Sequence, residues 1–278
     1  MRFRLLALDA DGSLLDPEGQ LRPRVREAVA EARRRSCEVV LCTGRRHRTA
    51  RGILEALDLD GPAVVQNGVR VVDGPSGRTL RGRYLPEDLY PAVIEVVRRF
   101  GPPLVYIDSP QRDIDIVVDD AGGGHPFQQD YVASNLEVIR EVDSLESKPA
   151  EPVVMVSCMA DSKTLDGLEA AARRELGERI DTHHIHNKMY DGHILEVLSA
   201  KANKWNAVRT VAEELGIAPA EIFALGDDEN DLPMIQGAGL GVAMANAKPA
   251  VRDAADFVTA SNAEDGAAQA IERFVLGA

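Results

Sequence analysis

Asp9-Ala-Asp11-Gly12-Ser13-Leu-Leu15 directly follows the short apolar run Phe3–Leu8, which is typical of a buried strand. Side chains at i and i+2 lie on the same side of a strand, so Asp9 and Asp11 can face one site at its carboxyl end. Neighbouring carboxyl groups have separated pKa values, which suits a nucleophile beside a general acid/base. An exposed acidic turn, or a calcium loop of the DxDxDG kind, is the alternative that this stretch alone leaves open.

Strand and helix patterns alternate on both sides of this stretch. The alternation runs to about residue 80, stops, and resumes near residue 192, which predicts an α/β fold with a doubly wound parallel sheet. The helix patterns are Val25–Ala32, Ala50–Leu57, Trp205–Leu215 and Ala268–Val275, and the strand patterns are Phe3–Leu8, Glu38–Cys42, Ala63–Gln66, Val69–Val72, Ile222–Leu225, Gly241–Met244 and Phe257–Thr259.

The segment from about Gly82 to Asp191 has a different, mixed pattern of helices and strands. It predicts a second, α+β domain inserted into the first. The expected division is residues 1–81 and 192–278 for the core, with residues 82–191 as the insert.

Two basic or hydroxyl-bearing motifs follow other elements of the core. Thr43-Gly44-Arg45 comes after a strand and before a helix, where a hydroxyl and backbone N–H groups can bind an anion. A capped helix start with Thr43 as the N-cap explains the same residues.

Lys204 lies near the start of the Trp205 helix. The helix dipole favours cations at the C-terminus, so a lysine at the start makes sense if it faces an anion. Lys201 is the competing choice, and a solvated surface lysine is the ordinary explanation.

The loop Gly226-Asp227-Asp228-Glu229-Asn230-Asp231 follows another apolar strand. Carboxylate oxygens are the ligands that Mg²⁺ prefers, and Mg²⁺ takes only one or two of them from a protein. An acidic surface loop is the alternative. All of these motifs are expected at strand ends or helix starts of one α/β pattern, and this coincidence favours a single site.

Together the motifs resemble the haloacid dehalogenase-like hydrolase superfamily, in the order DxDG[ST], Thr or Ser, Lys and GDxxND. Details typical of the Cof-type branch of phosphatases are Asn67-Gly68, Gly226–Asp231, Gly241–Ala247 and Asp265-Gly266. The resemblance covers residues 1–80 and 192–278. It implies a Rossmann-like core, and the insert matches a class II, subtype B cap in size and position.

The resemblance also implies roles for individual residues. Asp9 would be the nucleophile and Asp11 the general acid/base of a phosphatase that forms an aspartyl phosphate. The other implied roles are Mg²⁺ binding by Asp9, Asp227 and the Asp11 backbone carbonyl, phosphate binding by Thr43, Gly44, Lys204 and Asn230, substrate contact by Arg45 and Asn67, and orientation of Lys204 by Asp231.

The chain departs from the family pattern at two positions. Ser13 replaces the commoner Thr and keeps the hydroxyl. Trp205 replaces the Gly that usually follows the lysine, and we expect it to narrow the site.

Composition limits the partners and the compartment. The 278 residues carry a formal net charge of −13, which repels nucleic acid and anionic membranes. The sequence has no apolar run of the roughly 18 residues needed to span a membrane, and three cysteines without CxxC spacing fit a reducing compartment. We therefore expect a cytoplasmic protein.

His183, His184 and His186 raise the question of a zinc site. No cysteine pattern or HExxH accompanies them, so they are interpreted as ordinary strand or surface residues.

The function expected from the resemblance is a magnesium-dependent phosphatase of small phosphorylated metabolites such as sugar phosphates. A specific glycosyl or glycerate phosphatase, or a phosphomutase, is the alternative among enzymes. A non-catalytic phospho-receiver module also clusters Asp, Thr and Lys around magnesium, but it needs neither a general acid nor an insert the size of a domain.

Overall fold

The computed structural model describes residues 2–109, 113–187 and 192–277. The chain divides into two compact units, Met1–Gly82 with Asn203–Ala278, and Arg83–Ala202. The second boundary therefore lies eleven residues beyond the expected one at Asp191, because β11 (Gly192–Ser199) pairs with β9 (Val153–Ala160) and β10 (Ile180–Asn187) in the sheet of the second unit.

The first unit is built on an eight-stranded sheet with the order β14-β13-β12-β1-β2-β3-β4-β5. The six strands from β14 to β3 are parallel, and β4 and β5 are added antiparallel at one edge. Its strands are β1 (Leu5–Asp9), β2 (Glu38–Cys42), β3 (Pro62–Val65), β4 (Arg70–Asp73), β5 (Thr79–Gly82), β12 (Ile222–Gly226), β13 (Leu240–Ala243) and β14 (Phe257–Val258), and its helices are α1 (Pro23–Arg34), α2 (His47–Ala56), α6 (Lys204–Glu214), α7 (Leu232–Gly237), α8 (Pro249–Ala254) and α9 (Gly266–Ile271).

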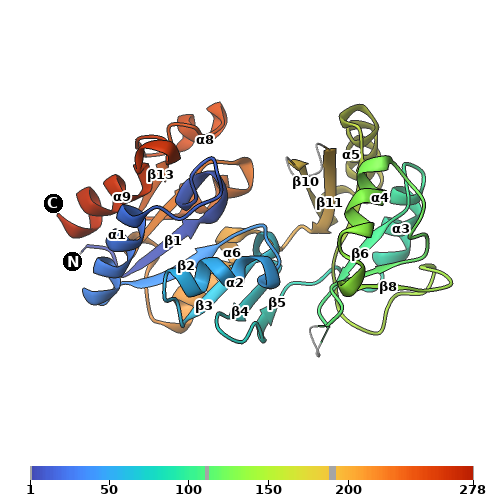
Figure 1. Cartoon of the computed structure of the whole chain (residues 1–278), viewed down its shortest axis with the longest axis horizontal. Helices are drawn as coiled ribbons and strands as arrows, with labels where there is room; N and C mark the ends of the chain where they lie inside the picture. Colours follow the sequence, from blue (N-terminus) through green and yellow to red (C-terminus); the bar gives the residue numbers. More distant parts are fainter. Residues whose placement is uncertain (1, 110–112, 188–191, 278) are drawn as a thin grey trace. The chain divides into compact units, whose positions relative to one another are not determined.

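Helices cover both faces of this sheet (Figure 1). Alternate residues of β1 enter different apolar clusters: Leu6 and Leu8 pack with α1, α2 and α9, whereas Leu5 and Ala7 pack with α6. The strand is buried along its whole length, as expected for a central parallel strand. The doubly wound α/β fold predicted from the sequence is confirmed, with an antiparallel extension at one edge.

The second unit has its own sheet and its own core. The strand order is β10-β11-β9-β6-β7-β8, and every pair is antiparallel except β7 with β8. Helices α3 and α5 pack over the apolar cluster on one face. Besides β9, β10 and β11, its elements are α3 (Tyr90–Arg98), β6 (Leu104–Ile107), β7 (Ile116–Val118), α4 (Pro126–Ala133), β8 (Ile139–Glu141) and α5 (Ser162–Leu176).

Across the described ranges, every helix is too short or too polar to cross a lipid bilayer.

Candidate functional site

The carboxyl edge of the first sheet gathers most of the predicted site residues. β1 lies between β12 and β2 and is parallel to both, so the three strands end at the same edge. Asp9 is the last residue of β1, Thr43 follows β2, and Asp227 follows β12. Topology thus brings together motifs that are up to about two hundred residues apart in sequence.

A buried lysine joins two carboxylates at the centre of this edge. Nζ of Lys204 donates to Oδ1 of Asp9 at 2.7 Å and to Oδ1 of Asp231 at 2.6 Å. The Lys204 residue is 1% exposed and Asp231 is fully buried. A buried ammonium requires such partners, because an unpaired charge in the interior is very costly.

The position of Lys204 follows from how α6 begins. Lys204 is the first residue of the helix, and the side chain of Asn203 accepts a hydrogen bond from the N–H of Asn206 at 2.8 Å. An asparagine directly before a helix is a sequence signal for its start, so the capping role of Asn203 was open to prediction and was missed. Lys201 is exposed and lies before the helix, in the turn after β11.

Asp231 also orders the acidic loop. Its Oδ2 accepts from the backbone N–H groups of Asp227 and Asp228, at 3.0 and 3.2 Å. Both oxygens of Asp231 are therefore engaged, one by Lys204 and one by the loop. This arrangement fits the expected orienting role better than direct ligation of a metal.

The carboxylates of Asp9, Asp227 and Asp231 each have an oxygen within 4.8 Å of the others. Gly12, with a φ of 77°, makes room for this approach, since a Cβ at that position would overlap the Asp227 carboxylate. Oδ2 of Asp9 is buried and accepts no hydrogen bond from any described residue. Three carboxylates beside one ammonium carry a net charge of −2 when all are ionised, and a divalent cation would balance it.

These residues fit a hard divalent cation, because such an ion binds oxygen ligands and the buried Oδ2 of Asp9 is available to it. The carboxylate cluster overlaps the implied ligand set at Asp9 and Asp227. Asp231 lies close to both, but Lys204 and the loop N–H groups engage its two oxygens. The side chain of Asp11 is absent from the cluster, as expected if only its backbone carbonyl is a ligand.

Burial and like charges disturb the ionisation of this group. Burial, followed by the charge of Asp231, raises the pKa of Asp9 well above its usual range, against the opposing effect of Lys204. Burial and the charges of Asp231 and Asp228 raise the pKa of Asp227 to about 7. Burial alone would lower the pKa of Lys204, but the Asp231 and Asp9 carboxylates raise it above its usual range.

Asp11 lies at the exposed side of the site. The chain leaves the strand after Asp9, and the irregular turn Ala10–Leu14 turns Asp11 outward. Arg45 donates two hydrogen bonds to the Asp11 carboxylate, from Nε to Oδ2 at 2.8 Å and from Nη2 to Oδ1 at 2.6 Å. The structure therefore places Arg45 next to the candidate acid/base.

Thr43 is fully buried beside the same edge. It is not the N-cap of α2, which begins at His47. Its hydroxyl accepts from the N–H of Arg45 at 3.1 Å instead, so the capped-helix explanation of this residue is wrong.

Gly44, Asn67 and Asn230 form the remaining wall. Nδ2 of Asn230 donates to Oδ1 of Asn67 at 2.9 Å, and a Cβ on Gly44 would press on that oxygen. Oδ1 of Asn230 is buried without a hydrogen-bond partner in the described part of the chain. Three of the predicted phosphate and substrate residues, Gly44, Asn67 and Asn230, therefore lie against one another.

Trp205 does not narrow the site as expected. Its indole packs against Gly237 of α7, where a Cβ would overlap the ring. It joins the apolar cluster of α6 and the sheet. The tryptophan and the glycine are complementary in volume, so the indole that departs from the family pattern is accommodated by α7.

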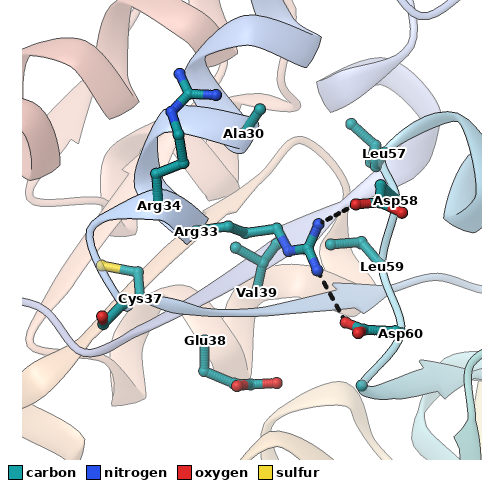
Figure 2. Close-up of a pocket in the computed structure, with 12 residues that line it drawn as sticks. Ala30, Arg33, Arg34, Cys37, Glu38, Val39, Leu57, Asp58, Leu59 and Asp60 are labelled. Carbon is teal, nitrogen blue, oxygen red and sulfur yellow. Dashed lines mark hydrogen bonds and ion pairs between the residues drawn. The ribbon is translucent and has the colours of Figure 1, made fainter.

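A cavity of about 610 Å³ lies at the opposite edge of the sheet (Figure 2), where β2 begins at Glu38. Arg33 spans it, with hydrogen bonds to Asp58 at 2.9 Å and to Asp60 at 2.8 Å. None of the predicted site residues lines it. This cavity is therefore separate from the candidate site.

Known proteins are similar to this chain in sequence and in fold. A family model described as haloacid dehalogenase-like hydrolase matches residues 6–271. The putative phosphatase YxeH of Bacillus subtilis is 32% identical, with 99% of each chain covered, and the pyridoxal phosphate phosphatase YbhA of Escherichia coli is 30% identical, with 98% of each covered. A crystal structure of a haloacid dehalogenase-like hydrolase from Bacteroides thetaiotaomicron matches with a TM-score of 0.78 at 28% identity, over 98% of this chain and 99% of that one.

These likenesses extend over nearly the whole length of the chain, and they confirm the family that the motifs indicated. The chain belongs to the haloacid dehalogenase-like hydrolase family, in its Cof-type branch, and is a phosphoric monoester hydrolase.

Proposed function

We propose that the protein is a Mg²⁺-dependent phosphatase of small phosphorylated metabolites, sugar phosphates first among them, and that it acts through a phosphorylated Asp9. The observation that carries this proposal is the pairing of a buried, incompletely satisfied Asp9 carboxylate with a buried lysine. A nucleophile must be held in place with an oxygen available for attack, and Asp9 meets both conditions.

In the first step, a carboxylate oxygen of Asp9 attacks phosphorus while the bond to the leaving oxygen breaks. Asp11 gives its proton to that oxygen. In the second step, Asp11 takes a proton from water, the water oxygen attacks phosphorus, and the Asp9 carboxylate leaves, so inorganic phosphate is released and both residues return to their initial states.

The neighbouring residues hold the transferred group. Lys204, the Thr43 hydroxyl and the Asn230 amide would bind the phosphoryl oxygens, and phosphoryl transfer depends mainly on such positioning and charge stabilisation. A Mg²⁺ ion on Asp9, Asp227 and the Asp11 carbonyl would neutralise phosphoryl charge when bound. Arg45 orients Asp11 and, with Asn67, would contact the rest of the substrate.

The second unit would act as the cap that selects the substrate, a role that its size and its place in the chain support. A cytoplasmic location agrees with the three cysteines, which are all buried as thiols. The proposed partner is a small phosphorylated molecule, without nucleic acid or membrane.

A phosphate-release screen with Mg²⁺ tests the proposal over sugar phosphates, glycerate phosphates and pyridoxal phosphate. We expect release from at least one sugar phosphate and none by Asp9→Asn, because an amide cannot form the aspartyl phosphate. Transfer of phosphate within the substrate without release would identify a phosphomutase. Stable phosphorylation of the protein without turnover would identify a receiver module.

A further inference from the structure

Three histidines lie together on one face of the sheet in the second unit. His184 and His186 are two residues apart on β10, and His193 of β11 is directly opposite His186 in the register. Residues at i and i+2 and cross-strand partners share a face, so the three imidazoles point to the same side. His183 lies on the other face, where it is opposite Glu196.

The rings are spaced as metal-bound imidazoles are. The ring centroids of His184 and His193 are 5.2 Å apart, and those of His186 and His193 are 4.8 Å apart. Two imidazoles that share one zinc ion through Zn–N bonds of about 2.0–2.1 Å have ring centres roughly 5 Å apart in tetrahedral geometry.

His184 is also oriented as a metal ligand would be. Its Nδ1 lies 3.4 Å from Oδ1 of Asp166 on α5, the helix that packs on β10 and β11. Its Nε2 is buried and has no hydrogen-bond partner in the part of the chain that the structure describes. A carboxylate on one ring nitrogen fixes the tautomer and leaves the other nitrogen to the metal, which is the usual arrangement around ligating histidines.

We propose that His184, His193 and His186 bind one divalent transition-metal ion, such as Zn²⁺, separately from the acidic site of the first unit. The three ring nitrogens are not yet assembled, since the one preassembled triplet among the described residues is Asp9, Asp227 and Asp231. His184 and His193 are the anchoring pair, and the exposed His186 completes the site by rotation about its side-chain torsions.

Ligand chemistry separates the two sites. Imidazole nitrogen suits Zn²⁺, Ni²⁺ and Cu²⁺, whereas Mg²⁺ prefers oxygen ligands and needs no imidazole. A metal on both strands would clamp the edge strand β10 to β11, and an ion that binds only the folded state raises its stability. The proposal departs from the interpretation of His184 and His186 as ordinary strand or surface residues, and it adds His193, which the sequence patterns did not single out.

The test is a calorimetric titration of the full chain with Zn²⁺ in excess Mg²⁺, which keeps the carboxylate site filled. We expect one Zn²⁺ per chain. His184→Asn and His193→Asn should each weaken binding at least tenfold, and Asp166→Asn should weaken it about 10–100-fold. His183→Asn, on the opposite face, is the matched control and should bind as the original chain does.

Three results would overturn the proposal: no binding of Zn²⁺, unchanged binding by both His184→Asn and His193→Asn, or an equal loss in His183→Asn. Far-UV circular dichroism without metal checks that each variant is folded. If His184→Asn or His193→Asn unfolds, the exposed His186→Asn decides, since the proposal requires it to weaken binding and to reduce the rise in melting temperature on adding Zn²⁺.

Discussion

Lys204 keeps its charge in a place where burial alone would favour the neutral amine. Two carboxylates, those of Asp9 and Asp231, hold it there at hydrogen-bond distance. In turn, Lys204 limits how far burial can raise the pKa of Asp9. The nucleophile proposed here therefore depends on a lysine from another part of the chain for both its position and its charge.

Lys204→Ala should lower the turnover of phosphate release about a hundred- to a thousandfold, as the loss of one electrostatic contact to a transferring group typically does. Lys201→Ala, which removes an exposed side chain outside the site, should change it only slightly. Both variants are compared on the same substrate, with thermal unfolding as a check on folding. A large loss of turnover in Lys201→Ala, together with near-normal turnover in Lys204→Ala, would contradict the placement of Lys204 in the site.

Chelation should abolish turnover and Mg²⁺ should restore it. Without a cation, Asp9 and Asp227 place like charges beside an anionic substrate. Phosphate release is measured in excess chelator and again after Mg²⁺ is added back. Full activity in the chelator would rule out the proposed mechanism.

Mg²⁺ should stabilise the protein more at pH 8 than at pH 6. The pKa of Asp227 is raised to about 7, so the folded protein without metal retains a proton there at pH 6. The free energy of unfolding of the metal-free protein therefore falls as the pH rises from the ordinary aspartate pKa of 3.8 toward 7. Over the same range the affinity for Mg²⁺ rises, by up to about tenfold per pH unit below the pKa of Asp227.

The rise in melting temperature on adding Mg²⁺ measures this effect at each pH. Asp227→Asn is the control and should show a smaller shift that changes less between pH 6 and pH 8, because it lacks the carboxyl group whose pKa is about 7. An equal shift of the original chain at both values would show that no proton leaves Asp227 on binding.

At the scale of elements, α6 is held by a fit between helices as well as by its cap. Trp205 at its start packs on Gly237 at the end of α7, and the absence of a Cβ there lets the indole approach the backbone. This contact lies on the face of α6 that joins the sheet core, and it fixes the helix whose first residue is Lys204. The Trp205–Gly237 contact therefore helps to hold Lys204 in place, although neither residue belongs to the candidate site.

Gly237→Ala should destabilise the protein by about 1–3 kcal/mol, the usual cost of overpacking. Trp205→Gly should lose stability by leaving a void, and the double variant should lose less than the sum of the two. Chemical denaturation of the four proteins gives the coupling free energy. Simple additivity would show that the two residues do not depend on each other.

At the scale of the whole molecule, each unit has apolar clusters of its own among the described residues. Two clusters lie within Met1–Gly82 and Asn203–Ala278, and the third lies within Arg83–Ala202. Each unit also has a complete sheet. These are the requirements for independent folding.

Replacing Arg83–Ala202 by a short Gly/Ser linker should leave a folded core with a cooperative unfolding transition. The segment Arg83–Ala202 expressed alone should fold as well. Circular dichroism and thermal unfolding of the two parts measure this. If neither part shows a transition of its own, the chain is one folding unit despite its two cores.

The sequence alone determined the family and the α/β class, and it named most of the candidate site residues. Hydrophobic periodicity is local, and residue chemistry at the end of a strand pattern is visible without coordinates. For this reason Asp9, Thr43, Lys204 and Asp227 could be named from their motifs. The same reasoning could place the second domain boundary only approximately, because the strand pattern of residues 192–199 does not say which sheet it joins.

Only the tertiary structure decided which groups meet. The contacts of Lys204 with Asp9 and Asp231 depend on strand order and helix position, and these are set by packing across long stretches of chain. Packing also decides the orientation of the Trp205 indole, which lies against Gly237, 32 residues further along the chain. Strand pairing likewise brings His193 beside His186. Local sequence pattern predicts the chemistry available to a residue, whereas tertiary packing determines which other residues it contacts.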